Sequence, residues 1–198
     1  MKQNVGILIS GSGSNMVELV KSMTDDHPGR AAVVVSNMQG ALGLERAKSL
    51  GVATRFIEYS SFGRDRLAFE AALQSILKDF DVDMLCLAGF MRILSPSFVT
   101  AWTDRILNIH PSLLPKFKGL NTHQRALNAE EHEAGCSVHL VTPELDDGPV
   151  LGQGRLPIFE DDTAETLAAR VLKLEHRLYP KVLHRFLLGE RKPIYITL

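Results

Sequence analysis

The chain has 198 residues, of which 45% are hydrophobic, and its formal net charge is −1. This length suits one domain with a sizeable core, and the balanced charge does not favour a nucleic-acid surface. The first apolar run stops at Ser10 and is too short for a signal segment, and no later run has the length of a membrane span. We therefore expect a single domain, residues 1–198, in the cytoplasm. Cys86 and Cys136 lie in apolar runs and are expected to be reduced core residues.

The first half of the chain alternates between two patterns. Short and nearly all-apolar runs are typical of strands buried on both faces, and they occupy Val5–Ile9, Ala31–Val35, Val52–Ile57, Met84–Ala88 and Ile106–Ile109. Amphipathic segments between them predict helices at Asn15–Met23, Ala41–Leu50, Arg64–Phe80 and Pro96–Trp102. This alternation predicts an α/β fold, with a doubly wound, mostly parallel sheet and helices on both faces.

The pattern changes after Ile109. A helix is expected around Gln124–Glu130, followed by strands at Ser137–Val141 and Val150–Ile158 that are joined through the turn sequence ELDDGP. A long amphipathic helix is expected at Thr163–Leu188, with Asp162 as its N-cap and Glu165 three residues later. Gly189 and then Pro193 are typical of the residues that follow a helix end.

The first predicted strand ends in the glycine-rich sequence SGSGSN, at Ser10–Asn15, and a helix follows at once. The free N–H groups at a helix start attract anions, and Ser14 and Asn15 add side-chain donors. The glycine spacing matches neither the dinucleotide fingerprint nor a Walker loop. The glycines taken alone favour an ordinary strand–helix turn, but the position at the carboxyl edge of a parallel sheet favours a monophosphate site.

The fourth predicted strand ends at Ala88 and leads into GFMRILSP, Gly89–Pro96, which is unusually apolar for a loop at a sheet edge. One interpretation is a loop folded over the core. The other is an apolar pocket for a ring system, with backbone groups that recognise its polar edge.

The fifth predicted strand ends with Asn108 and His110, which are two residues apart and so project to the same side. Pro111 and Pro115 restrict the loop that follows. An amide beside an imidazole is typical of an acyl-transfer site, where the amide polarises a carbonyl and the imidazole moves a proton. The sequence has no GxSxG motif, so we expect the nucleophile to belong to a substrate, such as an amine. A single histidine at a strand end is otherwise more often structural.

Two acidic positions extend this site. One carboxylate of the ELDDGP turn is expected to reach His110, orient it and favour its cationic form, although such turns are usually only solvated. Glu175 shares the apolar stripe of the last helix, so it either reaches water from the edge of the stripe or points inward at a ligand. Metal binding is less favoured than acid–base chemistry, because His123, His132 and His139 lack familiar ligand spacing.

Taken together, GSGSN, the Ser36–Asn37 pair, AGFMRILSP, NIHPSLLPKFKGLNTH, ELDDGP and LEH resemble the phosphoribosylglycinamide formyltransferase family of purine synthesis. The resemblance covers nearly the whole chain in one order. It implies a formyltransferase-like fold and formyl transfer from 10-formyltetrahydrofolate to the amine of glycinamide ribonucleotide. It also implies small-molecule substrates, a monomer or homodimer, and no metal, nucleic-acid or membrane partner.

The resemblance also implies roles for particular residues. The catalytic residues are Asn108, His110 and Asp146. The contacts to the ribonucleotide are Gly13, Ser14, Asn15 and Glu175. The contacts to the folate are Arg66, Met91, Arg92, Ile93, Leu94, Asn108 and Val141, with Arg64 as the alternative to Arg66. Asn121 stands where many members have histidine, which leaves the role of that position open.

Two other functions remain open at this level. A 10-formyltetrahydrofolate hydrolase would use water as the acceptor and would need no phosphate loop. A sensor of nucleotide or folate, without catalysis, would keep the loops but would not need the combination of Asn108, His110 and Asp146.

Overall fold

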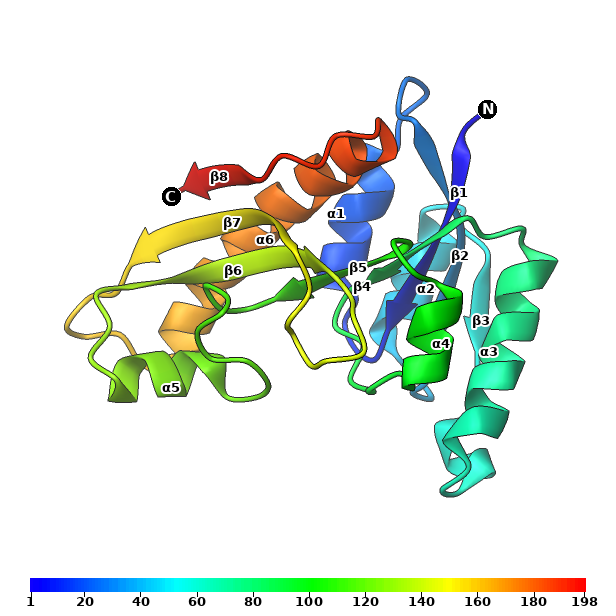
Figure 1. The fold of residues 1–198 in the computed structure, drawn as a ribbon, viewed down its shortest axis with the longest axis horizontal. Coiled ribbons are helices and arrows are strands. Elements are labelled where there is room, and N and C mark those ends of the chain that lie inside the picture. Colours follow the sequence, from blue (N-terminus) through cyan, green and yellow to red (C-terminus); the bar gives the residue numbers. More distant parts are fainter. The chain divides into compact units, whose positions relative to one another are not determined.

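The computed structural model describes residues 1–198 and has an α/β fold (Figure 1). The chain divides into two compact units, Met1–Leu107 and Asn108–Leu198. These are called the first and the second unit below. The expectation that residues 1–198 form a single domain stays a prediction.

The first unit is built on parallel strands in the order β3-β2-β1-β4. The strands are β1 (Gln3–Ile9), β2 (Gly29–Ser36), β3 (Thr54–Phe56) and β4 (Met84–Leu87). The helices are α1 (Ser14–Ser22), α2 (Leu42–Ser49), η1 (Tyr59–Phe62), α3 (Arg66–Asp79) and α4 (Pro96–Ala101). The side chains of Ile7, Leu8 and Ile9 are fully buried, as expected for a strand that is covered on both faces.

Strands β2 and β3 are added on one side of β1, whereas β4 pairs with β1 on its other side. Right-handed crossovers then place α1 and α2 on one face of the sheet and α3 on the other. Helices α3 and α4 lie side by side (Figure 1), where the Trp102 indole N–H just after α4 donates to Gln74 Oε1 at 2.8 Å. The predicted doubly wound, mostly parallel arrangement is confirmed.

The second unit has the strand order β5-β6-β7-β8. Its elements are the end of β5 (Ile106–His110), α5 (Thr122–Asn128), β6 (Glu133–Leu140), β7 (Val150–Pro157), α6 (Ala164–Leu187) and β8 (Ile194–Thr197). Strands β6 and β7 are antiparallel, whereas β7 and β8 are parallel. Helix α6 runs along β6 and β7 (Figure 1) and buries the predicted stripe of Leu167, Val171, Leu174, Leu178 and Val182.

One sequence prediction for this unit is wrong, and one strand was missed. The N-cap of α6 is Thr163, because its hydroxyl accepts from the Thr166 N–H while the Thr166 hydroxyl accepts from the Thr163 N–H. Asp162 instead accepts a hydrogen bond from the Phe159 N–H at 2.8 Å. Strand β8 was not predicted at all, since its four residues form an isolated run after Pro193.

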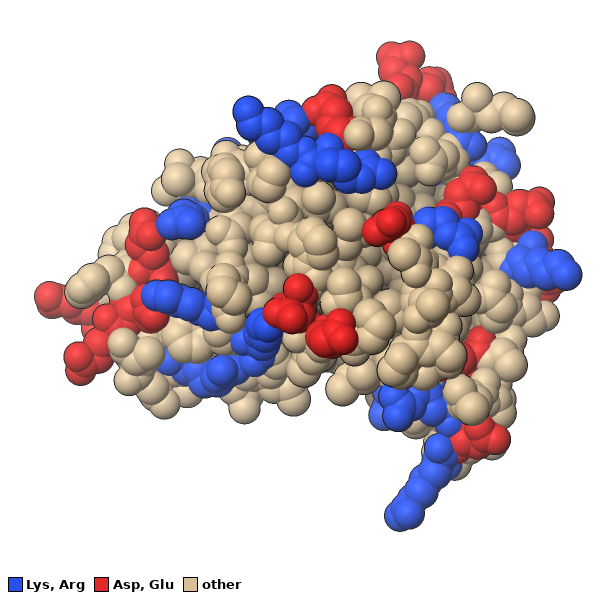
Figure 2. Space-filling view, in the orientation of Figure 1, with Lys and Arg blue, Asp and Glu red and all other residues tan.

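Acidic and basic side chains are interspersed on the face drawn in Figure 2, in keeping with the net charge of −1. None of the helices combines the length and the apolar composition that crossing a membrane requires.

Gly135 offers a test of whether the two units unfold together. A Cβ atom at this position on β6 would lie 1.8 Å from the Gly154 carbonyl oxygen of the paired strand. Gly135→Ala should therefore destabilise the second unit by about 3 kcal/mol, which lowers the melting temperature by roughly 8 °C for a domain of this size. The only tryptophan, Trp102, reports unfolding of the first unit.

If residues 1–198 form one domain, the Trp102 fluorescence melt and the far-ultraviolet dichroism melt of Gly135→Ala shift by the same amount. An unshifted Trp102 melt would show that the two units unfold independently. Gly11→Ala is the matched control, because no atom lies within 4 Å of a Cβ at that position.

Candidate active site

The loop between β1 and α1 has the compact shape that the glycine pattern predicted. Gly13 is the N-cap of α1 and has φ 68°, and a Cβ there would lie 2.8 Å from the Cα of Gly43. The Gly43 N–H donates to the Gly11 carbonyl at 3.1 Å, which holds α2 against the loop. Ser14 and Asn15 form the first turn of α1, where backbone N–H groups attract an anion.

Ser10 ties the ends of three strands of the first unit together. Its hydroxyl donates to Asn37 Oδ1 at 2.6 Å, just after β2. The same hydroxyl accepts from the Met91 N–H at 2.8 Å, and the Ser10 N–H donates to the Gly89 carbonyl at 3.0 Å, both just after β4. The predicted phosphate loop and the predicted folate loop are therefore linked at one edge of the sheet of the first unit.

The loop after β4 exposes apolar side chains. Met91 is 69% and Ile93 66% exposed, whereas Leu94 is buried. The loop is fixed where α4 begins, because the buried carboxylate of Glu70 accepts from the Ser95 N–H at 2.6 Å and also from the Ser95 hydroxyl. Of the two interpretations, the exposed Met91 and Ile93 favour an apolar surface for a ligand over a loop that only covers the core.

The arginines predicted near the folate differ in their surroundings. The guanidinium of Arg92 lies 3.8 Å from the centre of the Tyr59 ring, in a cation–π contact. Arg66 is the first residue of α3 and is exposed, and Arg64 is exposed two residues earlier. The structure favours neither of these two over the other.

In the second unit, Asp146 lies between two imidazoles. Its Oδ2 is 3.4 Å from His110 Nδ1, and its Oδ1 is 3.6 Å from His139 Nε2. The Gly119 N–H donates to Oδ2 at 2.9 Å. The Asp146 side chain is 9% exposed, so the carboxylate is largely shielded from water. Of the two adjacent aspartates of the turn, Asp146 is the one that reaches His110, as predicted, whereas Asp147 pairs with Lys118.

Asn108 and His110 end β5, and both are held by neighbouring groups. Asn108 Nδ2 lies 3.2 Å from His139 Nε2, and His110 Nε2 lies 3.0 Å from the Phe117 carbonyl oxygen. Both nitrogens of the His110 ring therefore face acceptors. The imidazolium satisfies both contacts, whereas a neutral ring donates to only one of them.

His139 is a member of this group that the sequence did not identify, since the sequence presented it only as an unconvincing metal ligand. Its Nδ1 lies 2.7 Å from the Leu140 carbonyl oxygen and therefore carries the proton in the neutral ring. Its Nε2 then accepts from the Asn108 amide, which orients that amide and leaves the second N–H of Asn108 for another acceptor. The structure has no group of three or more His, Cys, Asp or Glu residues placed to hold a metal ion.

The surroundings of His110 and Asp146 shift both pKa values. Burial lowers the pKa of His110, although the hydrogen bond to Phe117 and the charge of Asp146 both raise it. Burial raises the pKa of Asp146, but the nearby His139 ring and the Gly119 N–H outweigh it, and the net pKa is lowered. Asp146 thus acts on His110 in the predicted direction. Burial has the larger effect, however, so the net pKa of His110 is lowered.

Two further predicted residues lie in the second unit. Val141 follows β6 and is half-buried. Glu175 is 8% exposed on the buried stripe of α6, so it does not reach water from the edge of the stripe. This stripe packs on β6 and β7, and burial together with the charge of Glu175 raises the pKa of the Cys136 thiol on β6.

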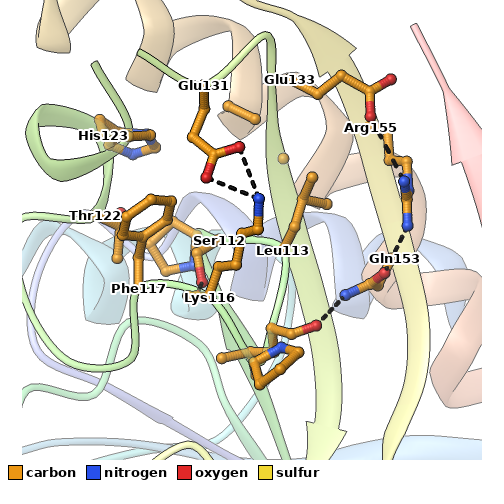
Figure 3. Close-up of a pocket in the computed structure, with 16 residues that line it drawn as sticks. Ser112, Leu113, Lys116, Phe117, Thr122, His123, Glu131, Glu133, Gln153 and Arg155 are labelled. Atoms are coloured by element: carbon orange, nitrogen blue, oxygen red, sulfur yellow. Dashed lines mark hydrogen bonds and ion pairs between the residues drawn. The ribbon is translucent and has the colours of Figure 1, made fainter. Parts of the chain in front are cut away.

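A pocket of about 260 Å³ lies against the segment that follows His110. Figure 3 shows the Lys116–Glu131 ion pair in this pocket, with His123 on one side and Arg155 on the other. Gln153, from β7, donates to the Leu114 carbonyl at 2.8 Å and to the Ser137 hydroxyl at 3.0 Å. These buried contacts fix the start of the loop that includes Phe117 and Gly119.

The fold and these groups of residues define the class of protein. The sequence pattern of the formyl transferase family matches residues 3–183, and the chain belongs to that family. The predicted formyltransferase-like fold is confirmed by solved structures. The phosphoribosylglycinamide formyltransferase of Brucella melitensis is 48% identical, with a TM-score of 0.90 over 96% of this chain and 98% of that one. Glycinamide ribonucleotide transformylase 1 of Symbiobacterium toebii is 42% identical, with a TM-score of 0.91 over 97% and 92% of the two chains.

Curated relatives agree with this assignment. The phosphoribosylglycinamide formyltransferase of Escherichia coli (strain K12) is 45% identical over 190 residues, which cover 96% of this chain and 89% of that protein. The trifunctional purine biosynthetic protein adenosine-3 of Bos taurus is 42% identical over 183 residues, or 92% of this chain. The chain spans only 18% of the length of that trifunctional protein. The resemblance found in the sequence is confirmed.

Asp146→Asn tests how the carboxylate acts on His110. The change keeps the shape of the side chain but removes its charge, so the pKa of His110 should fall further. The cationic fraction at neutral pH should shrink, and turnover should drop by about 10²–10⁴-fold. Activity should partly recover as the pH is lowered, until protonation of an amine substrate removes the nucleophile. A pH–rate profile measures both effects.

Asp147→Asn is the matched control, because the Asp147 side chain is 53% exposed and pairs with Lys118. It should cost little activity. A severe loss in Asp147→Asn with little in Asp146→Asn would mean that the wrong carboxylate has been assigned, and thermal melts of both variants exclude unfolding as the cause.

Proposed function

We propose that the chain transfers the formyl group of 10-formyltetrahydrofolate to the amine of glycinamide ribonucleotide in de novo purine synthesis. Membership of the formyl transferase family supports the reaction class. The name of the Escherichia coli relative, phosphoribosylglycinamide formyltransferase, supports glycinamide ribonucleotide as the acceptor of the formyl group. The observation that carries the mechanism is the position of Asp146 beside His110, with Asn108 on the same strand.

In this proposal the amine nitrogen attacks the formyl carbon, and the carbonyl oxygen becomes an oxyanion. The free N–H of Asn108 and the His110 ring stabilise that oxyanion, and one such donor is typically worth about 3 kcal/mol. The bond between the formyl carbon and the folate nitrogen then breaks. The proton lost by the amine reaches that nitrogen through water. The products are the formylated ribonucleotide and tetrahydrofolate.

The lowered pKa of His110 fits this sequence of steps. Burial favours the neutral ring before reaction, whereas an oxyanion that forms beside the ring adds a negative charge and raises its pKa. The ring therefore binds its proton most strongly when the tetrahedral intermediate is present. Asp146, whose own pKa is lowered, stays ionised at neutral pH and supplies the fixed opposing charge.

The substrate contacts are part of the same proposal. We infer that Gly13, Ser14, Asn15 and Glu175 bind the ribonucleotide, whose phosphate suits the N-terminal turn of α1. The exposed apolar side chains of Met91 and Ile93 suit the folate ring. The remaining folate contacts are proposed as Arg66, Arg92, Leu94, Asn108 and Val141.

No metal is proposed to take part. The family match at residues 3–183 extends over both units and supports one formyltransferase domain. We further propose that the protein acts in the cytoplasm as a monomer or homodimer.

A coupled assay tests the overall reaction. Purified protein should convert 10-formyltetrahydrofolate to tetrahydrofolate only when glycinamide ribonucleotide is present, and mass spectrometry should show one formyl group added to the ribonucleotide. Equal release of formate without the ribonucleotide would instead identify a hydrolase. Absence of any turnover, with both ligands bound, would identify a sensor.

The ribonucleotide contacts can be tested separately from catalysis. Replacing both Ser14 and Asn15 with alanine removes side-chain donors from the first turn of α1, so affinity for the ribonucleotide should fall about tenfold or more. Affinity for the folate should stay near normal, as measured by calorimetry. Ser12→Ala is the control, because Ser12 is exposed in the same loop and lies outside the helix. Equal losses for both ligands would contradict this division of the site.

A further inference from the structure

Arg125 on α5 holds a backbone segment that the proposed mechanism depends on. Its Nη1 donates to the Lys118 carbonyl at 2.5 Å and lies 3.3 Å from the Leu120 carbonyl oxygen. Its guanidinium also lies 5.4 Å from the centre of the Phe117 ring. The side chain is exposed, so it approaches the segment Phe117–Asn121 from the solvent side.

The same segment holds His110 and Asp146 through its backbone. The Phe117 carbonyl accepts from His110 Nε2 at 3.0 Å, and the Gly119 N–H donates to Asp146 Oδ2 at 2.9 Å. The carbonyls that face Arg125 belong to Lys118 and Leu120. The peptide group between Lys118 and Gly119 thus binds Arg125 through its carbonyl and Asp146 through its N–H, and the preceding peptide group binds His110 through the Phe117 carbonyl.

The backbone of the segment needs such support. Phe117 has φ 55°, Gly119 has φ 78° and Asn121 has φ 56°. These values lie in the left-handed region, which residues with a Cβ adopt at a cost unless their surroundings hold them there. Asn121 is the N-cap of α5 without a side-chain capping bond, so its side chain does not secure this end of the segment.

We propose that Arg125 is a positioning residue, which clamps Phe117–Asn121 in the conformation that orients His110 and Asp146. This inference rests on the proposed function of that pair. An arginine suits the task because its planar, rigid guanidinium can bind two carbonyls and still stack on an aromatic ring. A lysine at the same place keeps the charge, but its flexible ammonium cannot stack on the ring and does not hold its donors in a rigid plane.

The charge of Arg125 also acts on His110, and the two effects must be separated. That charge lowers the pKa of His110, as does the charge of His139, whereas the Phe117 carbonyl and Asp146 raise it. His123 on α5 is the other titratable group that interacts with His110. Loss of the clamp weakens the raising contacts, while loss of the charge removes a lowering one. Arg125→Lys isolates the clamp, and Arg125→Met removes both.

The test compares Arg125→Lys, Arg125→Met and wild type by steady-state kinetics, a pH–rate profile, thermal melts and an NMR titration of His110 without substrates. Arg191→Met is the matched control in the second unit. Arg191 Nη1 donates to the Phe186 carbonyl at 2.8 Å and lies 3.3 Å from that of Glu190, and its guanidinium stacks 3.6 Å from the Phe186 ring centre. It makes the same kinds of contact far along the chain from His110.

The clamp predicts that both Arg125 variants lose about 10–100-fold in kcat, the scale of a misplaced catalytic group, with KM values and melting temperatures near wild type. It also predicts a lower pKa of His110 in Arg125→Lys and near-normal activity in Arg191→Met. Wild-type kinetics and titration in Arg125→Lys would overturn the proposal, because charge alone would then suffice. A lower melting temperature with unchanged kcat and pKa would also overturn it.

The failure of the proposed function has a different signature. If wild type transfers no formyl group, but Arg125→Lys still lowers the pKa of His110 in the NMR titration, the clamp stands and the assigned reaction is rejected.

Discussion

The arrangement of the second unit around its polar groups depends on one buried carboxylate. Asp146 faces His110 with one oxygen and His139 with the other, and it accepts the Gly119 N–H. Removing a carboxylate from water is costly unless hydrogen bonds and opposing charges compensate. The groups that compensate here are the same ones that orient Asn108 and His110. The contacts that allow Asp146 to be buried are therefore also the contacts that align the proposed site.

The backbone conformation of the turn between β6 and β7 places the Asp146 carboxylate in this position. Asp146 itself has φ 50°, in the left-handed region. A Cβ at Gly148 would lie 1.9 Å from the Leu140 carbonyl oxygen, so only glycine permits the close return of the chain. The Leu140 N–H donates to the Pro149 carbonyl at 3.0 Å and closes the turn. The Leu140 carbonyl also holds His139 Nδ1, which connects the turn geometry to the tautomer of His139.

Much of this organisation could be predicted from the sequence, because it depends on periodicity. Apolar runs placed the parallel strands, the stripe of α6 placed Glu175 among buried residues, and the two-residue spacing placed Asn108 and His110 on one side of β5. His139 could not be found in this way. The register of β6 and β7 shifts between Val138 and His139, and such a bulge re-aims a side chain that simple alternation would place elsewhere. The cap of α6 was misassigned because Asp162 and Thr163 are both good N-cap residues, and only the hydrogen bonds distinguish them.

The net effect of charge and burial on the pKa of His110 also could not be predicted from the sequence. The spacing of residues identifies a carboxylate partner, which favours the cation, but it does not report how much water the ring loses. In the folded second unit burial has the larger effect, so the opposing charge of Asp146 limits the fall of the His110 pKa and does not reverse it. A ring poised in this way responds to small changes in its surroundings. A developing negative charge on a substrate shifts it towards the cation, whereas loss of the Phe117 contact shifts it towards the neutral form. The chemistry of the ring is thus set by the backbone segment that holds it as much as by its carboxylate partner.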